Sequence, residues 1–248
     1  MPDLRIAADD VALAHLAAES VVESAAAAIR ERGRFTIALC GGGTPRPAYE
    51  LLASPAFASR IDWPSVHVFW GDERCVPPSD PMSNFRMADE ALLQRVPIPR
   101  PNVHRMLGED DPSVAAASYE LLLRQFFPPG PSDTSEESFD LVLLGLGTNG
   151  HTASLFPGRP VLHERRHWTA PDFVEEIAAW RITLTVPILN AARAVSFLVF
   201  GIEKADVLRR VLQGPSQPDD LPAQLIQPHG QFTWLVDAAA ASLLATSS

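Results

Sequence analysis

Short apolar runs alternate along the chain with longer segments in which apolar positions recur every three or four residues. A short, nearly continuous apolar run is typical of a strand that is buried on both faces of a parallel sheet. A run of alternating apolar and threonine positions at 181–186 predicts one more strand. The apolar runs that predict buried strands are 35–40, 66–70, 139–144, 194–200 and 232–236.

The segments between these runs predict helices. Asp9 or Asp10 can cap a helix that runs to about Arg32, and Gly33 is placed to end it. We expect further helices through 49–52, at about 84–95, 113–127 and 203–212, and in the alanine-rich C-terminal segment, with a polar surface connection at 128–137. Strands that alternate with helices predict an α/β fold with a mostly parallel sheet covered on both faces, in a single domain spanning 1–248.

Composition excludes several classes of protein. The formal charge of −10 argues against a nucleic-acid partner or an anionic membrane surface, both of which need clustered basic residues. Cys40 and Cys75 form neither a CxxC pair nor a disulfide framework, which suits a reducing cytoplasm. The chain begins without a signal-like segment, and no uninterrupted apolar run is long enough to span a membrane. We therefore expect a cytoplasmic protein without a membrane partner.

A glycine-rich turn follows the predicted strand 139–144 and ends on a histidine. Glycines at 145, 147 and 150 allow the backbone to turn sharply and to pass close to a ligand, and His151 follows them. Ligands of open α/β sheets bind at the carboxyl edge of the strands, where this turn lies. His151 is therefore the first candidate for a catalytic residue.

The same turn matches the dinucleotide-binding pattern GxGxxG. The full fingerprint also requires an acidic residue about 20 positions later, at the end of the next strand. Residues 164–172 do not read as a clear strand that ends in an acid. The sequence therefore does not favour a nicotinamide cofactor.

Residues 41–45, Gly-Gly-Gly-Thr-Pro, form a second glycine turn between a predicted strand and a predicted helix. Its backbone amides and the Thr44 hydroxyl suit a phosphate group, whereas a plain tight turn would have the same composition. No Gly-Lys-Ser/Thr follows, so the turn is not a Walker loop. The turn itself leaves both interpretations open.

Charged residues provide the remaining candidates. Asp72, Glu73 and Arg74 follow the strand 66–70, where they form either part of a ligand site or a solvated loop. Arg181 and Lys204 are the basic residues best placed to neutralise a phosphate.

Several chemistries lack their motif. No HExxH motif, Cys/His cluster or Asp-rich loop is present, so we expect no metal site. Ser154 lies near His151 but outside any GxSxG elbow, which disfavours a serine nucleophile. Six other histidines sit in no comparable turn and are expected to be structural or exposed: His15, His67, His104, His163, His167 and His229.

Motifs along nearly the whole chain resemble the 6-phosphogluconolactonase family, within the glucosamine-6-phosphate isomerase/6-phosphogluconolactonase superfamily. The Gly-His-Thr-Ala-Ser-Leu-Phe-Pro string at 150–157 is highly specific to that family. The other matching segments are the Gly-Gly-Gly-Thr-Pro turn, Trp-Gly-Asp-Glu-Arg at 70–74, Ser-Asn-Phe at 83–85, Arg-Ile-Thr-Leu-Thr at 181–185, Gly-Ile-Glu-Lys at 201–204 and Leu-Pro-Ala at 221–223.

The resemblance implies a Rossmann-like fold and hydrolysis of 6-phosphoglucono-δ-lactone to 6-phosphogluconate in the oxidative pentose phosphate pathway, without a metal or organic cofactor. It implies His151 as the general base for water, with no covalent intermediate. Arg74, or the amides of the 147–150 turn, would stabilise the developing oxyanion. By the same resemblance Gly42, Gly43 and Thr44 would contact the 6-phosphate, Arg181 and Lys204 would neutralise it, and Asp72 would bind substrate.

The chain departs from the family pattern at Asn149, where the family commonly has aspartate. A neutral amide can orient the imidazole of His151 but cannot stabilise its charged form as a carboxylate does. A related sugar-phosphate isomerase or deaminase and a sugar-phosphate-sensing module stay open as alternatives. The first is disfavoured by Arg74 and by the missing acid after His151, and the second by the absence of a DNA-binding segment. We expect a monomer or a weak homodimer.

Overall fold

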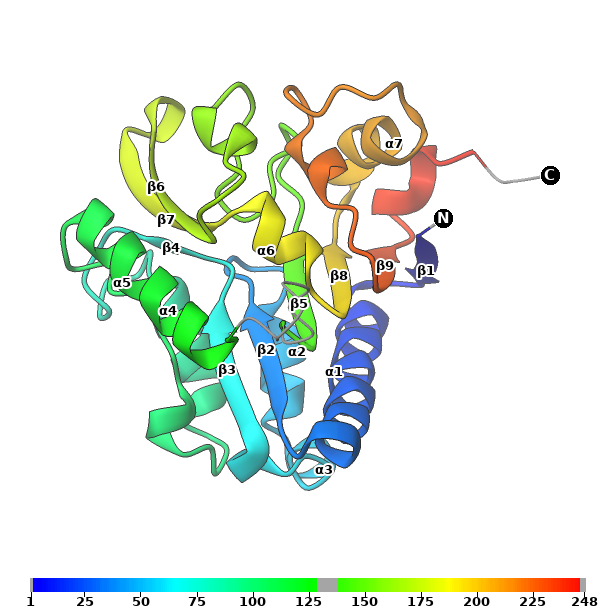
Figure 1. Ribbon diagram of the computed structural model, residues 1–248. Coiled ribbons are helices and arrows are strands. Elements are labelled where there is room, and N and C mark those ends of the chain that lie inside the picture. Colours follow the sequence, from blue (N-terminus) through cyan, green and yellow to red (C-terminus); the bar gives the residue numbers. More distant parts are fainter. Residues whose placement is uncertain (1, 129–137, 246–248) are drawn as a thin grey trace.

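The central element of the protein, in a computed structural model that describes residues 2–128 and 138–245, is a six-stranded sheet with the order β1-β9-β8-β5-β2-β3 (Figure 1). Every neighbouring pair in this sheet is parallel. Its strands are β1 (Asp3–Ala7), β2 (Phe35–Leu39), β3 (Val66–Trp70), β5 (Leu141–Gly145), β8 (Ala194–Val199) and β9 (Gln231–Asp237).

Helices cover both faces of this sheet, as the alternating pattern predicts. On one face, side chains such as Ile37, Val68 and Leu143 share a core with α1 (Asp10–Arg32), α2 (Arg46–Leu52), α3 (Pro55–Ala58) and α4 (Asn84–Ala88). On the other face, Phe69 and Phe197 share a second core with α5 (Pro112–Phe126), α6 (Val186–Asn190) and α7 (Ala205–Gln213). Apolar side chains on both faces explain why these strands read as continuous apolar runs.

Helix α1 begins and ends where its sequence predicts. The Asp9 carboxylate accepts a hydrogen bond from the Ala12 amide, and Gly33 closes the helix with a left-handed φ of 74°. By length and composition alone α1 is apolar enough to cross a membrane. One face of the helix packs into the core through residues such as Leu13 and Val21, and a core helix of a soluble protein has the same composition.

A smaller antiparallel sheet lies beside the parallel one, with the order β4-β7-β6. It comprises β4 (Asp72–Arg74), β6 (Thr169–Val174) and β7 (Ala179–Leu184) and lies above α5 in the view of Figure 1. The prediction of a strand near 181–186 is confirmed, but that strand pairs antiparallel outside the main sheet. Strands β4 and β6 were not predicted from the sequence, nor was β1, which is exposed over most of its length.

Three predicted helices differ from the observed ones. The helix expected at 84–95 consists of α4 followed by a π-helical turn at Asp89–Leu93. The helix expected from residue 203 begins with a 3₁₀ turn at Ile202–Lys204 that leads into α7. The prediction of an alanine-rich terminal helix is wrong, because the described part of that segment forms only a 3₁₀ turn at Ala240–Leu243. Most of the connection expected at 128–137 lies outside the described residues.

The order in which strands are added to the sheet reverses between β2 and β5. After β2 the chain adds β3 at one edge of the sheet, whereas after β5 it adds β8 and then β9 toward the other edge. The chain therefore leaves these two adjacent strands in opposite directions. The two connections separate, and a crevice opens at the carboxyl ends of β2 and β5. This crevice is where both glycine turns predicted from the sequence lie.

Candidate active site

A cavity of about 260 Å³ opens at the carboxyl ends of β2 and β5. It brings together seven of the predicted site residues: Gly42, Gly43, Thr44, Asp72, Arg74, His151 and Lys204. Two predicted residues, Asn149 and Arg181, are not among its lining residues. A larger cavity of about 510 Å³, with α7 and β9 residues in its lining, has no titratable side chain there and so offers no acid or base.

The position of His151 depends on Gly147, Asn149 and Phe156. The imidazole lies stacked on the Phe156 ring, with centroids 4.2 Å apart. A Cβ atom at Gly147 would overlap the imidazole, so only glycine leaves room for it. Asn149 Oδ1 lies 2.6 Å from His151 Nδ1 and also accepts the backbone N–H of His151 at 3.2 Å. Because this oxygen accepts, the Nδ1 proton is held toward Asn149 and Nε2 carries the free lone pair.

The pKa of His151 is lowered to about 4. Burial is the largest cause, since the charged imidazolium loses hydration. The charge of Asp72 raises this pKa, whereas the positive charges of Lys204, Arg181 and Arg74 lower it. The imidazole is therefore neutral at physiological pH and able to accept a proton.

Two arginines lie opposite each other on neighbouring strands of the small antiparallel sheet. Arg74 on β4 is directly opposite Arg181 on β7. The Nε–H group of each is buried and has no hydrogen-bond partner in the part of the chain that the structure describes. Arg74 Nη1 donates to the carbonyl of Met82 at 2.7 Å. Arg181 acts on the cavity through its charge rather than by lining it, and both burial and the charge of Arg74 lower its pKa.

Lys204 lines the cavity from the end of the 3₁₀ turn that precedes α7. Burial lowers its pKa. It is the only lysine of the chain, in which the other 19 of the 20 basic residues are arginines. Its position near a helix start and the family resemblance both predicted Lys204, and its being the only lysine is a further signal in the sequence.

Asp72 is held by two residues to which the sequence analysis gave no role in the site. Ser154 Oγ donates to Asp72 Oδ2 at 2.6 Å, and Asn84 Nδ2 donates to Asp72 Oδ1 at 3.1 Å. The Ser154 proton is therefore directed at a carboxylate and not at His151, which agrees with the prediction that Ser154 is not a nucleophile. Asn84 also lines the cavity. The Ser-Asn-Phe motif at 83–85 pointed to this residue without giving it a role.

The first glycine turn is shaped by two of its glycines. Gly42 has a φ of 90°, in the left-handed region that favours glycine. Gly41 lies against the side chain of Asn84, with which a Cβ atom would overlap. The turn is therefore fixed in the cavity wall, with the Thr44 side chain beside it.

The dinucleotide fingerprint fails for a structural reason. A strand, β6, does follow the glycine turn and contains Asp172, contrary to the reading of 164–172 as no clear strand. That strand belongs to the antiparallel sheet, and the Asp172 carboxylate accepts hydrogen bonds from Arg159. Asp172 is therefore engaged by a guanidinium rather than presented to a ribose. Within residues 2–128 and 138–245, no group of three or more His, Cys, Asp or Glu side chains is arranged to hold a metal ion.

Comparison with known proteins agrees with this architecture. The chain matches the family described as glucosamine-6-phosphate isomerases/6-phosphogluconolactonase over residues 8–234. A 6-phosphogluconolactonase from a Nostoc species is 43% identical over 239 residues, which cover 95% of each chain. One from a Synechocystis species is 44% identical over 218 residues, which cover 86% of each chain. The solved structure of 6-phosphogluconolactonase from Trypanosoma brucei matches with a TM-score of 0.85 at 28% identity and covers 99% of both chains. The chain therefore belongs to the glucosamine-6-phosphate isomerase/6-phosphogluconolactonase family.

Proposed function

We propose that the protein hydrolyses 6-phosphoglucono-δ-lactone to 6-phosphogluconate, with His151 as general base and without a covalent intermediate. Relatives that match nearly the whole chain carry the name 6-phosphogluconolactonase, which supports this substrate. The observation that carries the mechanism is the imidazole whose Nδ1 is held by Asn149, in a cavity that Arg74 and Lys204 also line.

The reaction begins with a water molecule between His151 and the lactone carbonyl. His151 Nε2 accepts a proton from the water as its oxygen bonds to C1. The tetrahedral intermediate then collapses and breaks the bond between C1 and the ring oxygen. The proton held by His151 passes to that oxygen, which becomes a hydroxyl group, and the new carboxylic acid loses its proton to solvent. The base therefore returns to its neutral state after each turnover.

The cations divide between the two ends of the substrate. Arg74, or the amides of the 147–150 turn, stabilises the negative charge that the carbonyl oxygen gains in the intermediate. The 6-phosphate lies against Gly42, Gly43 and Thr44, where Lys204 neutralises it directly. Arg181 adds its charge from outside the cavity lining. Asp72, fixed by Ser154 and Asn84, is placed to accept a substrate hydroxyl.

The alternative activities have less support. An isomerase or deaminase needs an acid near the position of residues 155–157, which here are Leu-Phe-Pro, and Leu155 is fully buried. A sensing module does not require a neutral imidazole beside the ligand. A cytoplasmic location and a monomeric or weakly dimeric state stay predictions.

The proposal is tested by coupled oxidation of glucose 6-phosphate. Glucose-6-phosphate dehydrogenase generates the lactone, and 6-phosphogluconate dehydrogenase reports its hydrolysis. Adding the protein should accelerate the second step well above spontaneous hydrolysis. Equal rates with and without the protein would refute the proposed substrate.

A further inference from the structure

The site holds more positive than negative charge. Arg74, Arg181 and Lys204 surround His151, and none of them forms an ion pair with a carboxylate of the described residues. The direct opposition of Arg74 and Arg181 is unfavourable, because like charges opposite each other destabilise a sheet. Their buried Nε–H groups also lack acceptors in this part of the chain. An anion in the cavity would offset the charge repulsion, and for Arg74, which lines the cavity, it would also offer an acceptor.

The negative groups near the site do not balance these cations. Asp72 is the carboxylate that lines the cavity, and it already accepts hydrogen bonds from Ser154 and Asn84. Glu73 is committed to the Ser83 hydroxyl and to the amides of 74, 84 and 85. Glu203 acts on Lys204 but lies outside the cavity lining. The cavity lining therefore holds two cations, Arg74 and Lys204, and one carboxylate, Asp72.

These cations weaken the base that the reaction needs. Burial is the largest cause of the pKa of about 4 at His151, and Lys204, Arg181 and Arg74 lower it further, against the raising effect of Asp72. A general base acts best when its pKa lies near the working pH, so His151 is a poor proton acceptor before the substrate binds. A sugar phosphate carries close to two negative charges at neutral pH, since its second pKa is about 6.

We propose that the 6-phosphate of the substrate activates His151, because the bound dianion offsets Lys204, Arg74 and Arg181 and thereby turns a weak base into an effective one. The inference rests on the proposed function and adds a consequence to it. The phosphate contributes to the chemical step as well as to binding. An unphosphorylated lactone that occupies the same cavity meets a weaker base and is hydrolysed slowly even at saturation.

The direct test is an NMR titration of the His151 imidazole, assigned with His151→Gln, in the free protein and with saturating 6-phosphogluconate. Saturation is verified by a plateau in the ³¹P shift of the ligand. The ligand should raise the pKa of His151 by about 1–2 units, the size expected for a nearby opposite charge. An unchanged pKa at verified saturation would overturn the inference. A ³¹P signal that shows no binding would instead count against the proposed substrate.

Two variants of Lys204, the only lysine, separate the effect of its positive charge from the effect of its contact with the ligand. Lys204→Arg keeps the cation, and its ligand-induced pKa rise should match that of the native protein. Lys204→Met removes the cation, so the pKa of His151 should be higher before ligand is added and should rise less when it binds. The ligand also carries a carboxylate, and an equal rise in all three proteins would assign the effect to that group and overturn the inference.

Kinetics gives an independent readout. The acidic limb of kcat/KM reports the base in the free enzyme, and that of kcat reports it in the substrate complex. With the phosphorylated lactone the limb of kcat should lie about 1–2 pH units above that of kcat/KM. With glucono-δ-lactone the two limbs should coincide. Coincident limbs for both substrates would contradict the proposal.

Discussion

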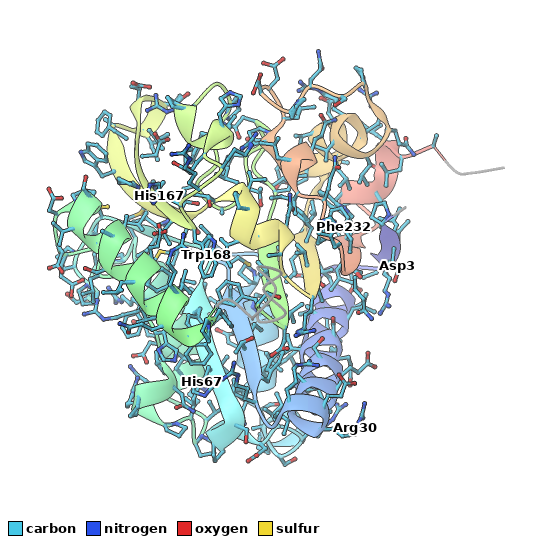
Figure 2. All side chains as sticks on the ribbon, in the orientation of Figure 1. Asp3, Arg30, His67, His167, Trp168 and Phe232 are labelled. Carbon is cyan, nitrogen blue, oxygen red and sulfur yellow. The ribbon has the colours of Figure 1, made fainter. Side chains whose placement is uncertain are left out.

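Two regions of the molecule partly bury histidines and lower their pKa values, yet only one of them has the surroundings of a catalytic base. In the first, His151 faces a cavity with one nitrogen held by Asn149 and three cations nearby. In the second, His67 Nδ1 lies 3.2 Å from His104 Nε2, and both rings pack against Phe126. Figure 2 shows His67 in the lower half of the molecule, far below the β6–β7 hairpin.

The pKa of His104 is also lowered to about 4, by burial and by the charge of His67. The same value therefore arises in two different ways. In the His67–His104 pair, each imidazole is the hydrogen-bond partner of the other, and both rings pack in an aromatic cluster with Phe126. At His151, one nitrogen is free to act on a ligand while the other is fixed. A lowered histidine pKa identifies a candidate base only when the free nitrogen faces a ligand cavity.

The largest effect should come from removing the base. His151→Ala should lower kcat by about 10²- to 10⁴-fold, the usual contribution of general base catalysis. Binding of 6-phosphogluconate should change little, because the proposed phosphate contacts are Gly42, Gly43, Thr44 and Lys204 and do not include the imidazole. The matched control is His104→Gln, which should retain near-native kcat. A His151→Ala protein with near-native kcat would remove the distinction between the two regions.

A smaller effect should follow from displacing the base without removing it. In Gly147→Ala the new methyl group overlaps the imidazole of His151 and must push it from its place. A misplacement of about 1 Å can cost on the order of 10²-fold in rate, so kcat should fall by that order. Gly145→Ala is the control, since a Cβ atom there meets no heavy atom within 4 Å. Equal losses in both variants would show that the turn as a whole, and not the position of the ring, matters.

The sequence predicted the parallel sheet well because each of its buried strands is a continuous apolar run. It missed the antiparallel sheet for a related reason. Strand β4 is three charged residues long, and β6 contains Pro171 and Asp172, so neither has an apolar pattern. These strands are specified by pairing with β7 rather than by their own composition.

The terminal helix failed because alanine content alone does not secure a helix. Strand β9 ends at Asp237. The Asp237 carboxylate accepts hydrogen bonds from the backbone amides of Gly201 and Ala240. The short described segment after it supports only one 3₁₀ turn.

Site residues could be predicted where a reactive or charged side chain lies shortly after a buried strand, as His151 does after β5 and Arg74 after β3. Ser154 and Asp72 are 82 positions apart in sequence, so the hydrogen bond between them could not be read from the chain. The same holds for Asn84, whose role depends on its contacts with Gly41 and Asp72.

A third prediction sharpens the comparison at Asn149. In Asn149→Asp a carboxylate replaces the amide oxygen that lies 2.6 Å from His151 Nδ1. A nearby negative charge favours the imidazolium, so the pKa of His151 should rise by about 1–3 units. A base with a higher pKa stays protonated to higher pH, and the acidic limb of kcat/KM should therefore move to higher pH. Superimposable pH profiles, corrected for spontaneous hydrolysis, would show that residue 149 does not couple to the base.

The smallest effect concerns stability and tests the histidine pair. His104 has a pKa of about 4 in the folded protein, below the ordinary value of 6.5, and burial lowers that of His67 as well. Between these values the unfolded chain binds protons that the folded protein does not, so the free energy of unfolding must fall as the pH drops from about 6.5 toward 4. Each histidine contributes at most about 1.4 kcal/mol per pH unit in that window.

His104→Gln cannot take up the proton. Urea unfolding of this variant at several pH values should therefore show a shallower decline in the free energy of unfolding than the native protein shows. The exposed His229 provides the control, because His229→Gln should reproduce the native slope. An unchanged slope in His104→Gln would mean that the pair already accepts protons in the folded state, and the second region would then lose the property it shares with His151.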